Sequence, residues 1–585
     1  MSGLSLAREQ KGDVVAALAL ACLLCLVWAF RDGHNLAALR LPDTDDAVRL
    51  QQIRDWLGGQ AFADLSQHRL GGGLAMHWSR LPDLVPAAII VLLRPLIGGH
   101  AAQVVAVIAW PALLLFAALA LVATIARTLG GGAIARTALV VAAIAYPATT
   151  LFLPGRIDHH GLQCVLLLVV LRTSVTPPTI GRGLHAGFAA TASLVVGLET
   201  APLIAAAGVA MAIDWLRARS GAEDRLMGFG IALGSGLLAA SIVFRTWQWT
   251  YPACDGFTAT AWRGAQIGAF APILLALAAR DVVRPASRIG LAAIVCGLIG
   301  WGVLHGSALC LAPYGAVDPL LAKLWLVRVG EAQPLLSAPL DVAIGYAGVM
   351  VAGIAAGAWQ WRRTRDARWG VLLIVQIACA ALTLAQLRGA YAGALLAAPA
   401  LAAAIAAARA KGSAWMAAAW LGSAGMLYPI AAQAVVPAPA RGARATPVAV
   451  DAARPGCTSP EALAALHRLG AGTLLAPLDL GAYALAGSRL AVVGAPYHRN
   501  NAGNNAVYRF FLDGDARGIA GQWHVTHVAI CADSFDELGR LPAAALATRL
   551  REGNAPGWLR PLPDTGTQMR LFAVQAGLSR RTGAR

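Results

Sequence analysis

Charged side chains are scarce in this sequence. Only 13% of its 585 residues are charged, and the 30 acidic residues are outnumbered by 47 basic ones. Soluble domains carry about 25% charged residues, so the chain is not a series of ordinary soluble domains. A hydrophobic share of 58% and a mean hydropathy of +0.62 indicate a membrane protein instead.

Cysteine pairs at metal-binding spacings are also missing. The nine cysteines include no C-x-x-C pair and no zinc-finger spacing, which excludes a metal cluster held by cysteines. Two of them, Cys457 and Cys531, lie in the polar carboxy-terminal part of the chain. They can form a disulfide if that part lies outside the cytoplasm, and unpaired buried thiols are the equal alternative.

The first apolar run, residues 14–30, is followed by no small-x-small cleavage site, which predicts an uncleaved membrane anchor. The net charge of +17 would suggest a nucleic-acid partner in a soluble protein. Here many arginines lie in short links between apolar runs, where they report orientation. We therefore predict membrane lipids as partners and no nucleic acid.

Apolar runs recur from residue 14 to about 430, and several approach the roughly 20 residues that cross a bilayer. We count about thirteen spans. The segment 84–97 is short and interrupted by prolines and an arginine, so we place it on the membrane surface. The strongly basic links all fall on one side, which the positive-inside rule makes cytoplasmic. The loops 31–100 and 306–339 then lie outside.

The tail from residue 436 to 585 has a different composition. It opens with the linker "PAPARGARATP" and continues with alternating strand-like and helix-like stretches such as "SPEALAALHRLG" and "HVTHVAICA". This pattern predicts a small soluble α/β domain. With an odd number of spans, residues 1–435 form the transmembrane domain and 436–585 an extracytoplasmic one.

The few acidic residues gather in the predicted outer layer. "LPDTDDAVRL" carries Asp43, Asp45 and Asp46, "RIDHHGLQ" carries Asp158, and "LVRVGEAQPLLS" carries Glu331. An acidic first turn of a helix explains the first group equally well, since Asp is a favoured N-cap. Three carboxylate positions in one layer favour a site instead.

Carboxylates from separate loops, with a histidine, suit a hard divalent cation such as Mg²⁺ or Mn²⁺. A nearby arginine, Arg388 in "QLRGAYAG", can grip phosphate. A metal and an arginine together can stabilise a diphosphate leaving group, and an apolar bundle can hold a lipid tail. The residues therefore predict group transfer from a lipid-linked phosphate.

The chain resembles the C-type (GT-C) membrane glycosyltransferases, in particular the catalytic subunit of oligosaccharyltransferase. The resemblance rests on four motifs in order along nearly the whole chain. They are Asp45 with Arg54 nine residues on (Asp43 being the competing choice), Asp158 and His160 at a D-x-D-like position, "RVGEAQP" with Glu331, and Arg388 with Tyr391.

This resemblance implies the roles of those residues. Asp45, Asp158 and Glu331 would be catalytic, and with His160 they would hold the metal. Arg388 would contact the donor phosphate. Asp45 and Glu331 would also engage the acceptor.

One family motif is degenerate. Where the family has W-W-D-Y-G, which reads the N-glycosylation sequon, this chain has "APLDLGAYAL", which keeps Asp479 and Gly481 but neither tryptophan. We therefore expect an acceptor other than a standard Asn sequon: a glycolipid, a polysaccharide or a protein. Asp479 and Tyr497 are candidate acceptor-binding residues.

The loop "GAPYHRNNAGNN" falls where the family places a segment near the active site. His498 and Arg499 are candidate ligands for the donor phosphate. A polar strand-to-helix loop with a satisfied histidine is the alternative.

The predicted protein is a glycosyltransferase of the bacterial inner membrane. It would use a polyprenyl-phosphate or polyprenyl-diphosphate sugar donor, with its active site and soluble domain on the periplasmic side. A secondary transporter or a flippase of a lipid-linked substrate is the alternative; a transporter predicts charges near mid-membrane and an inverted repeat.

Overall fold

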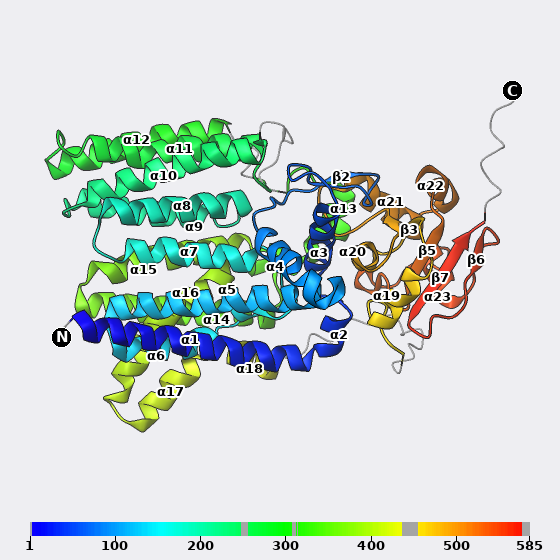
Figure 1. The fold of residues 1–585 in the computed structure, drawn as a ribbon, viewed down its shortest axis with the longest axis horizontal. Helices are drawn as coiled ribbons and strands as arrows, with labels where there is room; N and C mark the ends of the chain where they lie inside the picture. The colour runs from blue at the N-terminus through cyan, green and yellow to red at the C-terminus, as the bar shows by residue number, and fades with distance from the viewer. Residues whose placement is uncertain (1–2, 247–254, 307–311, 313, 436–453, 576–585) are drawn as a thin grey trace.

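The computed structural model describes residues 3–246, 255–306, 312, 314–435 and 454–575. A bundle of nearly parallel helices occupies most of the molecule, and the C-terminal domain sits on one end of it (Figure 1). The N-terminus lies at the opposite end of the bundle. The predicted linker after residue 435 and residues 307–311 of the predicted loop 306–339 lie outside the described residues.

Seven of the described helices are long and apolar enough to cross a membrane, so the chain is a multi-pass membrane protein. They are α1 (Gly3–Arg31), α5 (Gly99–Gly130), α10 (Ala222–Val243), α12 (Pro285–Gly306), α14 (Leu340–Thr364), α15 (Ala367–Ala385) and α16 (Gly389–Arg409).

Further helices complete the bundle. These are α4 (Leu84–Ile97), α6 (Gly132–Ala143), α7 (His160–Ser174), α8 (Ile180–Val196), α9 (Ala201–Leu216), α11 (Ala259–Leu277), α17 (Ser413–Ser423) and α18 (Leu427–Val435). Several are shorter than a bilayer is thick, so the count of thirteen spans stays a prediction, as does the surface position of α4.

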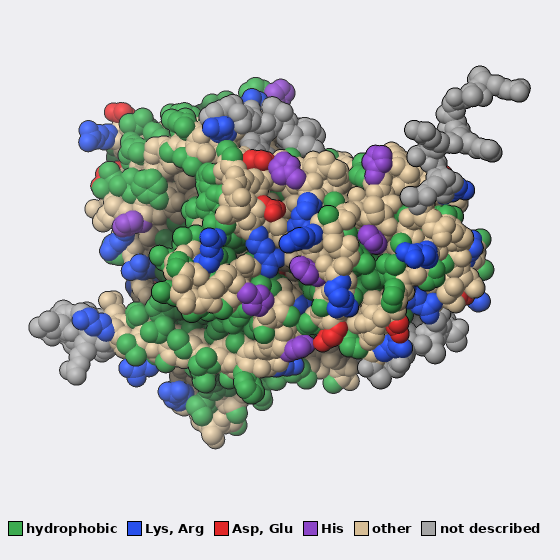
Figure 2. Space-filling model, turned by 45° about the vertical axis from the view of Figure 1, so that its right-hand side comes forward, with side chains coloured by type: hydrophobic (Ala, Val, Ile, Leu, Met, Phe, Trp, Pro, Cys, Tyr) green, Lys and Arg blue, Asp and Glu red, His purple; other side chains and the backbone are tan. Residues whose placement is uncertain are grey.

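Small residues bring the helices close together. A Cβ added to Gly183 of α8 or to Gly228 of α10 would meet the backbone of the other helix, so both positions require glycine for this packing. By contrast, α12 lies at the edge of the bundle (Figure 1) and exposes large apolar side chains such as Leu298 and Trp301. Figure 2 shows how much of the bundle surface is hydrophobic.

Two long segments cover the end of the bundle that faces the C-terminal domain. The first contains α2 (Gly33–Ala37), α3 (Thr44–Leu57) and the antiparallel strands β1 (Ser66–Gln67) and β2 (Leu74–Ala75). The second contains α13 (Pro319–Leu324) and the 3₁₀ turns η4 (Leu326–Arg328), η5 (Gly330–Ala332) and η6 (Leu335–Ser337). A further 3₁₀ turn, η1 (Ala148–Phe152), precedes α7.

The C-terminal domain is built on a five-stranded sheet in the order β4-β3-β5-β7-β6. Strand β3 is parallel to β4 and β5, and β7 is antiparallel to β5 and β6. The strands are β3 (Thr473–Leu475), β4 (Ala491–Val492), β5 (His527–Cys531), β6 (Leu559–Pro561) and β7 (Met569–Val574). With the helices that connect them, they confirm the predicted α/β fold.

The helices of this domain fall between and before the strands. They are α19 (Pro460–His467), α20 (Leu478–Gly487), α21 (Asn501–Leu512), α22 (Ala516–Gln522), the 3₁₀ turn η7 (Asp536–Leu538) and α23 (Leu546–Glu552). Cys457 and Cys531 form a disulfide, so of the two alternatives open from the sequence the disulfide holds.

The first covering segment is joined to the C-terminal domain by two partly buried arginines. Arg69 donates to the carbonyls of Leu485, Ser488 and Leu490 at 2.8–3.0 Å. Arg54, a member of the predicted motif, donates to the carbonyl of Ala486 at 2.7 Å. These hydrogen bonds hold the first covering segment against the C-terminal domain.

Candidate active site

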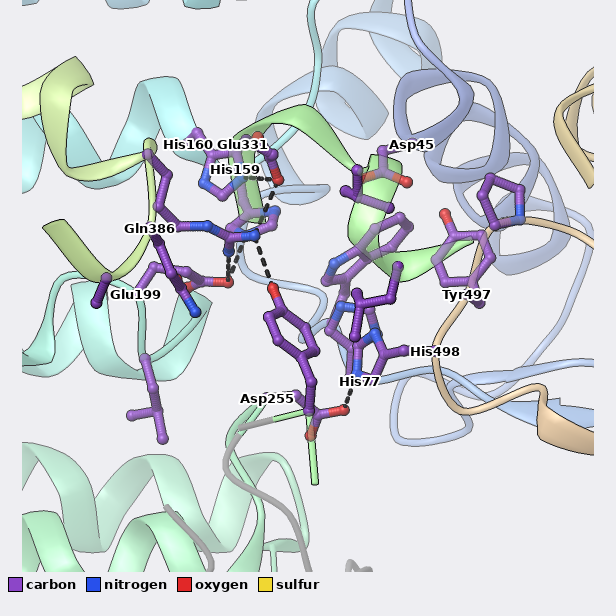
Figure 3. A pocket seen from close by; sticks show the side chains of 18 of the residues that line it. Asp45, His77, His159, His160, Glu199, Asp255, Glu331, Gln386, Tyr497 and His498 are labelled. Carbon is purple, nitrogen blue, oxygen red and sulfur yellow. Dashed lines mark hydrogen bonds and ion pairs between the residues drawn. The ribbon is translucent and has the colours of Figure 1, made fainter. Parts of the chain in front are cut away.

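A polar cavity of about 400 Å³ lies between the bundle end and the C-terminal domain (Figure 3). Segments far apart in the sequence each contribute a side chain to its lining. These side chains are Asp45, His77, Trp78, His159, His160, Glu199, Asp255, Tyr314, Glu331, Arg388, Tyr497 and His498.

The acidic triplet at the start of α3 divides into three roles. Asp43 is the N-cap and accepts from the Asp45 N–H at 3.2 Å. Asp45 faces the cavity. Asp46 is fully buried and accepts from the backbone N–H groups of Ile157 and Asp158, both at 2.8 Å. Asp46 therefore fixes the loop that carries Asp158.

Asp45 and Asp46 both have raised pKa values. Burial, and then the nearby carboxylates of Asp43, Asp158 and Glu331, raise the pKa of Asp45 well above its usual value. Burial also raises the pKa of Asp46, to about 7, although Arg156 opposes that shift. An excess of negative charge at Asp45 is what a cation bound there would relieve.

We expect Asp46→Ala to destabilise the protein. Two buried N–H groups lose their acceptor, which costs on the order of 3 kcal/mol. Thermal unfolding of the detergent-solubilised protein should show a Tm several degrees below wild type. Asp46→Asn keeps an acceptor oxygen and should lose less than half as much. A Tm for Asp46→Ala equal to wild type would show that the loop does not depend on this contact.

The D-H-H sequence places three polar side chains in contact. His159 Nδ1 lies 2.6 Å from Asp158 Oδ1, and His160 Nε2 lies 3.5 Å from Asp158 Oδ2. His160 Nε2 is also 3.6 Å from Glu331 Oε1. The structure thus brings together Asp158, His160 and Glu331, three of the four residues expected to bind metal. The fourth, Asp45, is close enough for Asp158 and Glu331 to raise its pKa, in addition to the larger effect of burial.

Glu199, which the sequence did not single out as a ligand, is a central partner. Its carboxylate accepts from Gln163 at 2.8 Å and lies 3.2 Å from His159 Nε2. Burial lowers the pKa of His159, but the flanking carboxylates of Asp158 and Glu199 outweigh it and raise that pKa to about 9. His159 is therefore a cation held between two carboxylates.

Glu331 and Arg388 form the next pair. Arg388 Nη2 lies 3.1 Å from Glu331 Oε1 and donates to the Tyr314 hydroxyl at 2.8 Å. Burial raises the pKa of Glu331, but Arg388 and His160 hold it at about 2. Arg388 precedes the first residue of α16, so its guanidinium stands at the bundle end of the cavity.

The other wall belongs to the C-terminal domain. Tyr497 and His498 line the cavity, whereas Arg499 is buried behind it. His498 Nε2 lies 2.6 Å from Asp255 Oδ2, and Arg499 Nε donates to the same oxygen at 2.6 Å. Asp255 thus contacts the side chains of His498 and Arg499, which we predicted to bind the donor phosphate. Asp479 is exposed in the first turn of α20 and does not line the cavity.

Some lining residues had little signal in the sequence. Tyr314 lies in the predicted outer loop 306–339 and Asp255 in the link before α11, and neither belongs to a recognisable motif. One general signal could have pointed to Asp255: acidic residues are scarce in this chain, with only 30 among 585 residues.

An apolar groove of about 540 Å³ adjoins the cavity. It lies among α8 to α12 and is lined by side chains such as Ile204, Phe229 and Leu275. Leu198 and Ala201 line both the groove and the polar cavity. The two spaces therefore meet.

The donor set fits a divalent cation. Three carboxylates and one imidazole, from Asp45, Asp158, Glu331 and His160, offer the oxygen-rich ligands that Mg²⁺ and Mn²⁺ prefer. The observation in favour is geometric: His160 Nε2 lies 3.5 Å from Asp158 Oδ2 and 3.6 Å from Glu331 Oε1, and Asp45 lines the same cavity as His160 and Glu331.

No protein family and no curated protein sequence matches this chain. Its fold, however, is similar to that of solved oligosaccharyltransferase structures, which confirms the predicted GT-C, oligosaccharyltransferase-like fold.

The neighbours include the Archaeoglobus fulgidus oligosaccharyltransferase in its apo form (TM-score 0.69, 14% identity, 98% of this chain and 75% of that one). They also include that enzyme with an inhibitory peptide and a dolichol-phosphate (0.60, 15%, 97% and 75%). A third is its complex with Zn and sulfate (0.58, 14%, 95% and 73%).

Proposed function

We propose that the protein transfers a sugar or glycan from a polyprenyl-phosphate or polyprenyl-diphosphate donor to an acceptor in the polar cavity. One observation carries this proposal: a cavity with a partly buried arginine and converging carboxylates opens onto an apolar groove through Leu198 and Ala201. A lipid-linked phosphate has the same two parts, a charged head and a long apolar tail.

The donor phosphate is assigned to Arg388. Its guanidinium presents several donors in a planar fork that matches phosphate, and it faces the cavity near the groove entrance. A divalent cation held by Asp45, Asp158, His160 and Glu331 would supply further charge neutralisation to the departing phosphate. The Zn and sulfate complex and the dolichol-phosphate complex of the archaeal neighbour support these ligand classes.

The reaction is displacement at the anomeric carbon. The acceptor attacks that carbon as its bond to the phosphate oxygen breaks, and Arg388 stabilises the charge that develops on the phosphate. Asp45 and Glu331 face the space where the acceptor must lie, so either carboxylate can orient it or receive its proton. Asp158 stays in place because Asp46 holds its backbone and His159 its side chain.

The acceptor is proposed to be something other than a standard Asn sequon. The first turn of α20 carries Asp479 where the family's tryptophan-rich motif would lie, and no tryptophan accompanies it. Tyr497 lines the cavity directly, which favours it over Asp479 as the acceptor contact. A glycolipid, a polysaccharide or a protein remains the acceptor class.

The cavity is proposed to face the periplasm of a bacterial inner membrane. Helices α9 and α11 begin at the cavity and α15 ends there, since Ala201, Asp255 and Ala385 line it. The basic links after α9 and α11 and before α15 therefore lie at the other end of the bundle, away from the C-terminal domain. Positive loops stay in the cytoplasm, so the cavity end faces the other side. The charged cluster lies at helix ends, whereas a transporter predicts charges near mid-membrane.

The direct test uses the purified full chain in nanodiscs with a radiolabelled polyprenyl-linked sugar. In parallel, glycolipids and glycoproteins are compared by mass spectrometry in strains with and without the gene. We expect accumulated lipid-linked donor and one missing glycan in the deletion strain. An unchanged glycome together with an unchanged donor pool would overturn the proposal.

Gly268→Leu tests the groove. No heavy atom lies within 4 Å of a Cβ added at Gly268 of α11, which lines the groove, so leucine should fill the groove without strain. We expect KM for a long polyprenyl donor to rise about tenfold with kcat unchanged, since each displaced CH₂ contact is worth ~0.8 kcal/mol.

Two controls accompany that variant. Gly290→Leu on α12 also meets no neighbour and lies outside the groove lining, so its kinetics should match wild type. A donor shortened to two isoprene units should be unaffected by Gly268→Leu. Equal KM changes for long and short donors would remove the groove from the proposal.

A further inference from the structure

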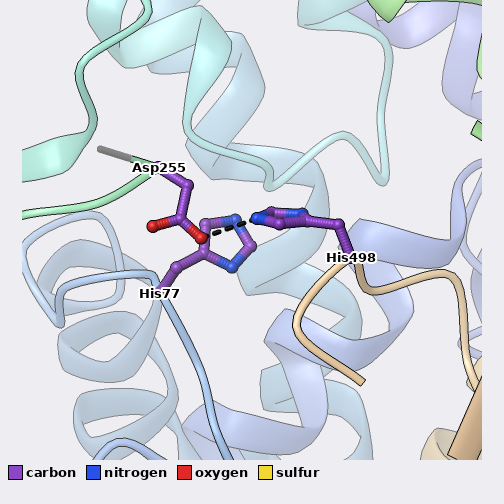
Figure 4. A group of neighbouring side chains, drawn as sticks. All are labelled: His77, Asp255 and His498. Carbon is purple, nitrogen blue, oxygen red and sulfur yellow. Dashed lines mark hydrogen bonds and ion pairs between the residues drawn. The ribbon is translucent and has the colours of Figure 1, made fainter. Parts of the chain in front are cut away.

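A second cluster of metal-ligating side chains lies on the cavity wall formed with the C-terminal domain. His77 follows β2, Asp255 precedes α11, and His498 follows β4. One ligand atom from each of the three lies within 4.8 Å of the others. Figure 4 shows the two imidazole rings converging on the Asp255 carboxylate.

We propose that His77, Asp255 and His498 form a zinc site with an open coordination position toward the cavity. Two imidazoles and one carboxylate are a common ligand set for zinc with three protein ligands. Imidazole nitrogen disfavours Mg²⁺ and Ca²⁺, which prefer oxygen. All three residues line the cavity, so the fourth position is open to water or to an anionic oxygen.

His77 provides an independent argument. Its ring contacts Trp78, Tyr497 and His498, yet neither ring nitrogen makes a hydrogen bond to any described residue in the structure. An imidazole that lies beside a carboxylate and a second imidazole, with no hydrogen-bond partner of its own among the described residues, is suited to bind a metal ion.

The neighbouring arginine completes the arrangement. Arg499 Nε donates to Asp255 Oδ2 at 2.6 Å, and its Nη2 pairs with Oδ1. Carboxylates that bind metals are themselves commonly hydrogen-bonded, and such contacts fix their orientation. Arg499 therefore orients Asp255 toward the two imidazoles and balances its charge.

The zinc site is distinct from the acidic cluster. Trp78 stands between them, with its ring centroid 5.0 Å from that of His77 and 6.1 Å from that of His159. The zinc site also joins three parts of the chain: the first covering segment, the segment before α11 and the C-terminal domain. Because its residues differ from those of the acidic cluster, the zinc proposal does not depend on the proposed sugar transfer.

The test measures zinc binding to the full chain in nanodiscs after chelator treatment and gel filtration. An Asp158→Asn background weakens the acidic cluster, and zinc is titrated against a chromophoric chelator. We expect this background to bind one zinc tightly, and His77→Ala or His498→Ala to weaken that binding at least tenfold. His185→Ala, an exposed histidine on α8, should bind zinc like the background.

Cobalt provides a readout that does not depend on activity. Co²⁺ in the Asp158→Asn background should give the intense visible bands of a four-coordinate site, and His77→Ala should abolish them. If His77→Ala aggregates, X-ray absorption of the zinc-loaded background protein decides, with two imidazole ligands expected. Zinc affinity within twofold of the background in His77→Ala, or a zinc spectrum with fewer than two imidazoles, would overturn the proposal.

Discussion

Asp45→Asn is expected to lower kcat/KM for sugar transfer by about a thousandfold, or ~4 kcal/mol of transition-state stabilisation. The amide keeps the size of the side chain but removes a negative charge from the cavity. Burial, and then the carboxylates of Asp43, Asp158 and Glu331, raise the pKa of Asp45, so a cation bound beside it would stabilise its charged form. The measurement is transfer from a labelled polyprenyl donor by purified protein.

Asp43→Asn is the matched control on the same helix turn. Asparagine is as good an N-cap as aspartate, so α3 should keep its start, although the 2.6 Å ion pair with Arg156 is lost. We expect less than a fivefold loss of activity. Equal losses in the two variants, or full activity in Asp45→Asn, would contradict the assignment of Asp45 to the site.

The acidic triplet shows what a sequence can and cannot decide. Consecutive helical residues point about 100° apart, so Asp43, Asp45 and Asp46 cannot all serve one purpose. The capping interpretation holds for Asp43. Local patterns alone cannot tell Asp45 from Asp46, and only the family spacing to Arg54 favoured Asp45. The difference depends on the loop of Ile157 and Asp158, which packs against α3 from more than 100 residues away.

The bundle was the most predictable part of the fold. Apolar runs and basic links follow from the cost of burying polar groups in lipid, and they need no knowledge of tertiary contacts. Helix ends were less predictable. Segment 84–97 forms α4 and turns directly into α5 through Gly98, whose positive φ of 82° suits glycine. Length alone cannot tell whether such a helix crosses the membrane.

Contacts between distant segments were the least predictable. The pairing of His498 with Asp255 spans 243 residues, and neither residue has a local pattern that names the other. Sequence reasoning assigned His498 and Arg499 to phosphate because their loop falls where the family places a segment near the active site. Both side chains already contact the Asp255 carboxylate, which moves the phosphate assignment toward Arg388.

Arg388→Ala is expected to reduce kcat/KM at least a hundredfold and to weaken binding of undecaprenyl phosphate at least tenfold. Alanine removes the fork that would grip the phosphate, and it removes the guanidinium that lies 3.1 Å from Glu331 and 3.7 Å from Glu199. Arg388→Lys keeps one positive charge but cannot bind bidentately, so it should recover part of the affinity. Lipid binding is measured by native mass spectrometry and transfer by the labelled-donor assay.

The backbone around Arg388 should keep its structure in both Arg388→Ala and Arg388→Lys. The segment 314–339 is held to the start of α16 by backbone bonds: Arg388 N–H donates to the Glu331 carbonyl at 3.1 Å and Leu387 N–H to the Gln333 carbonyl at 2.9 Å. Neither bond uses the Arg388 side chain. A loss of lipid binding with an unchanged Tm therefore reports the guanidinium itself, and unchanged lipid binding in Arg388→Ala would place the donor phosphate elsewhere in the cavity.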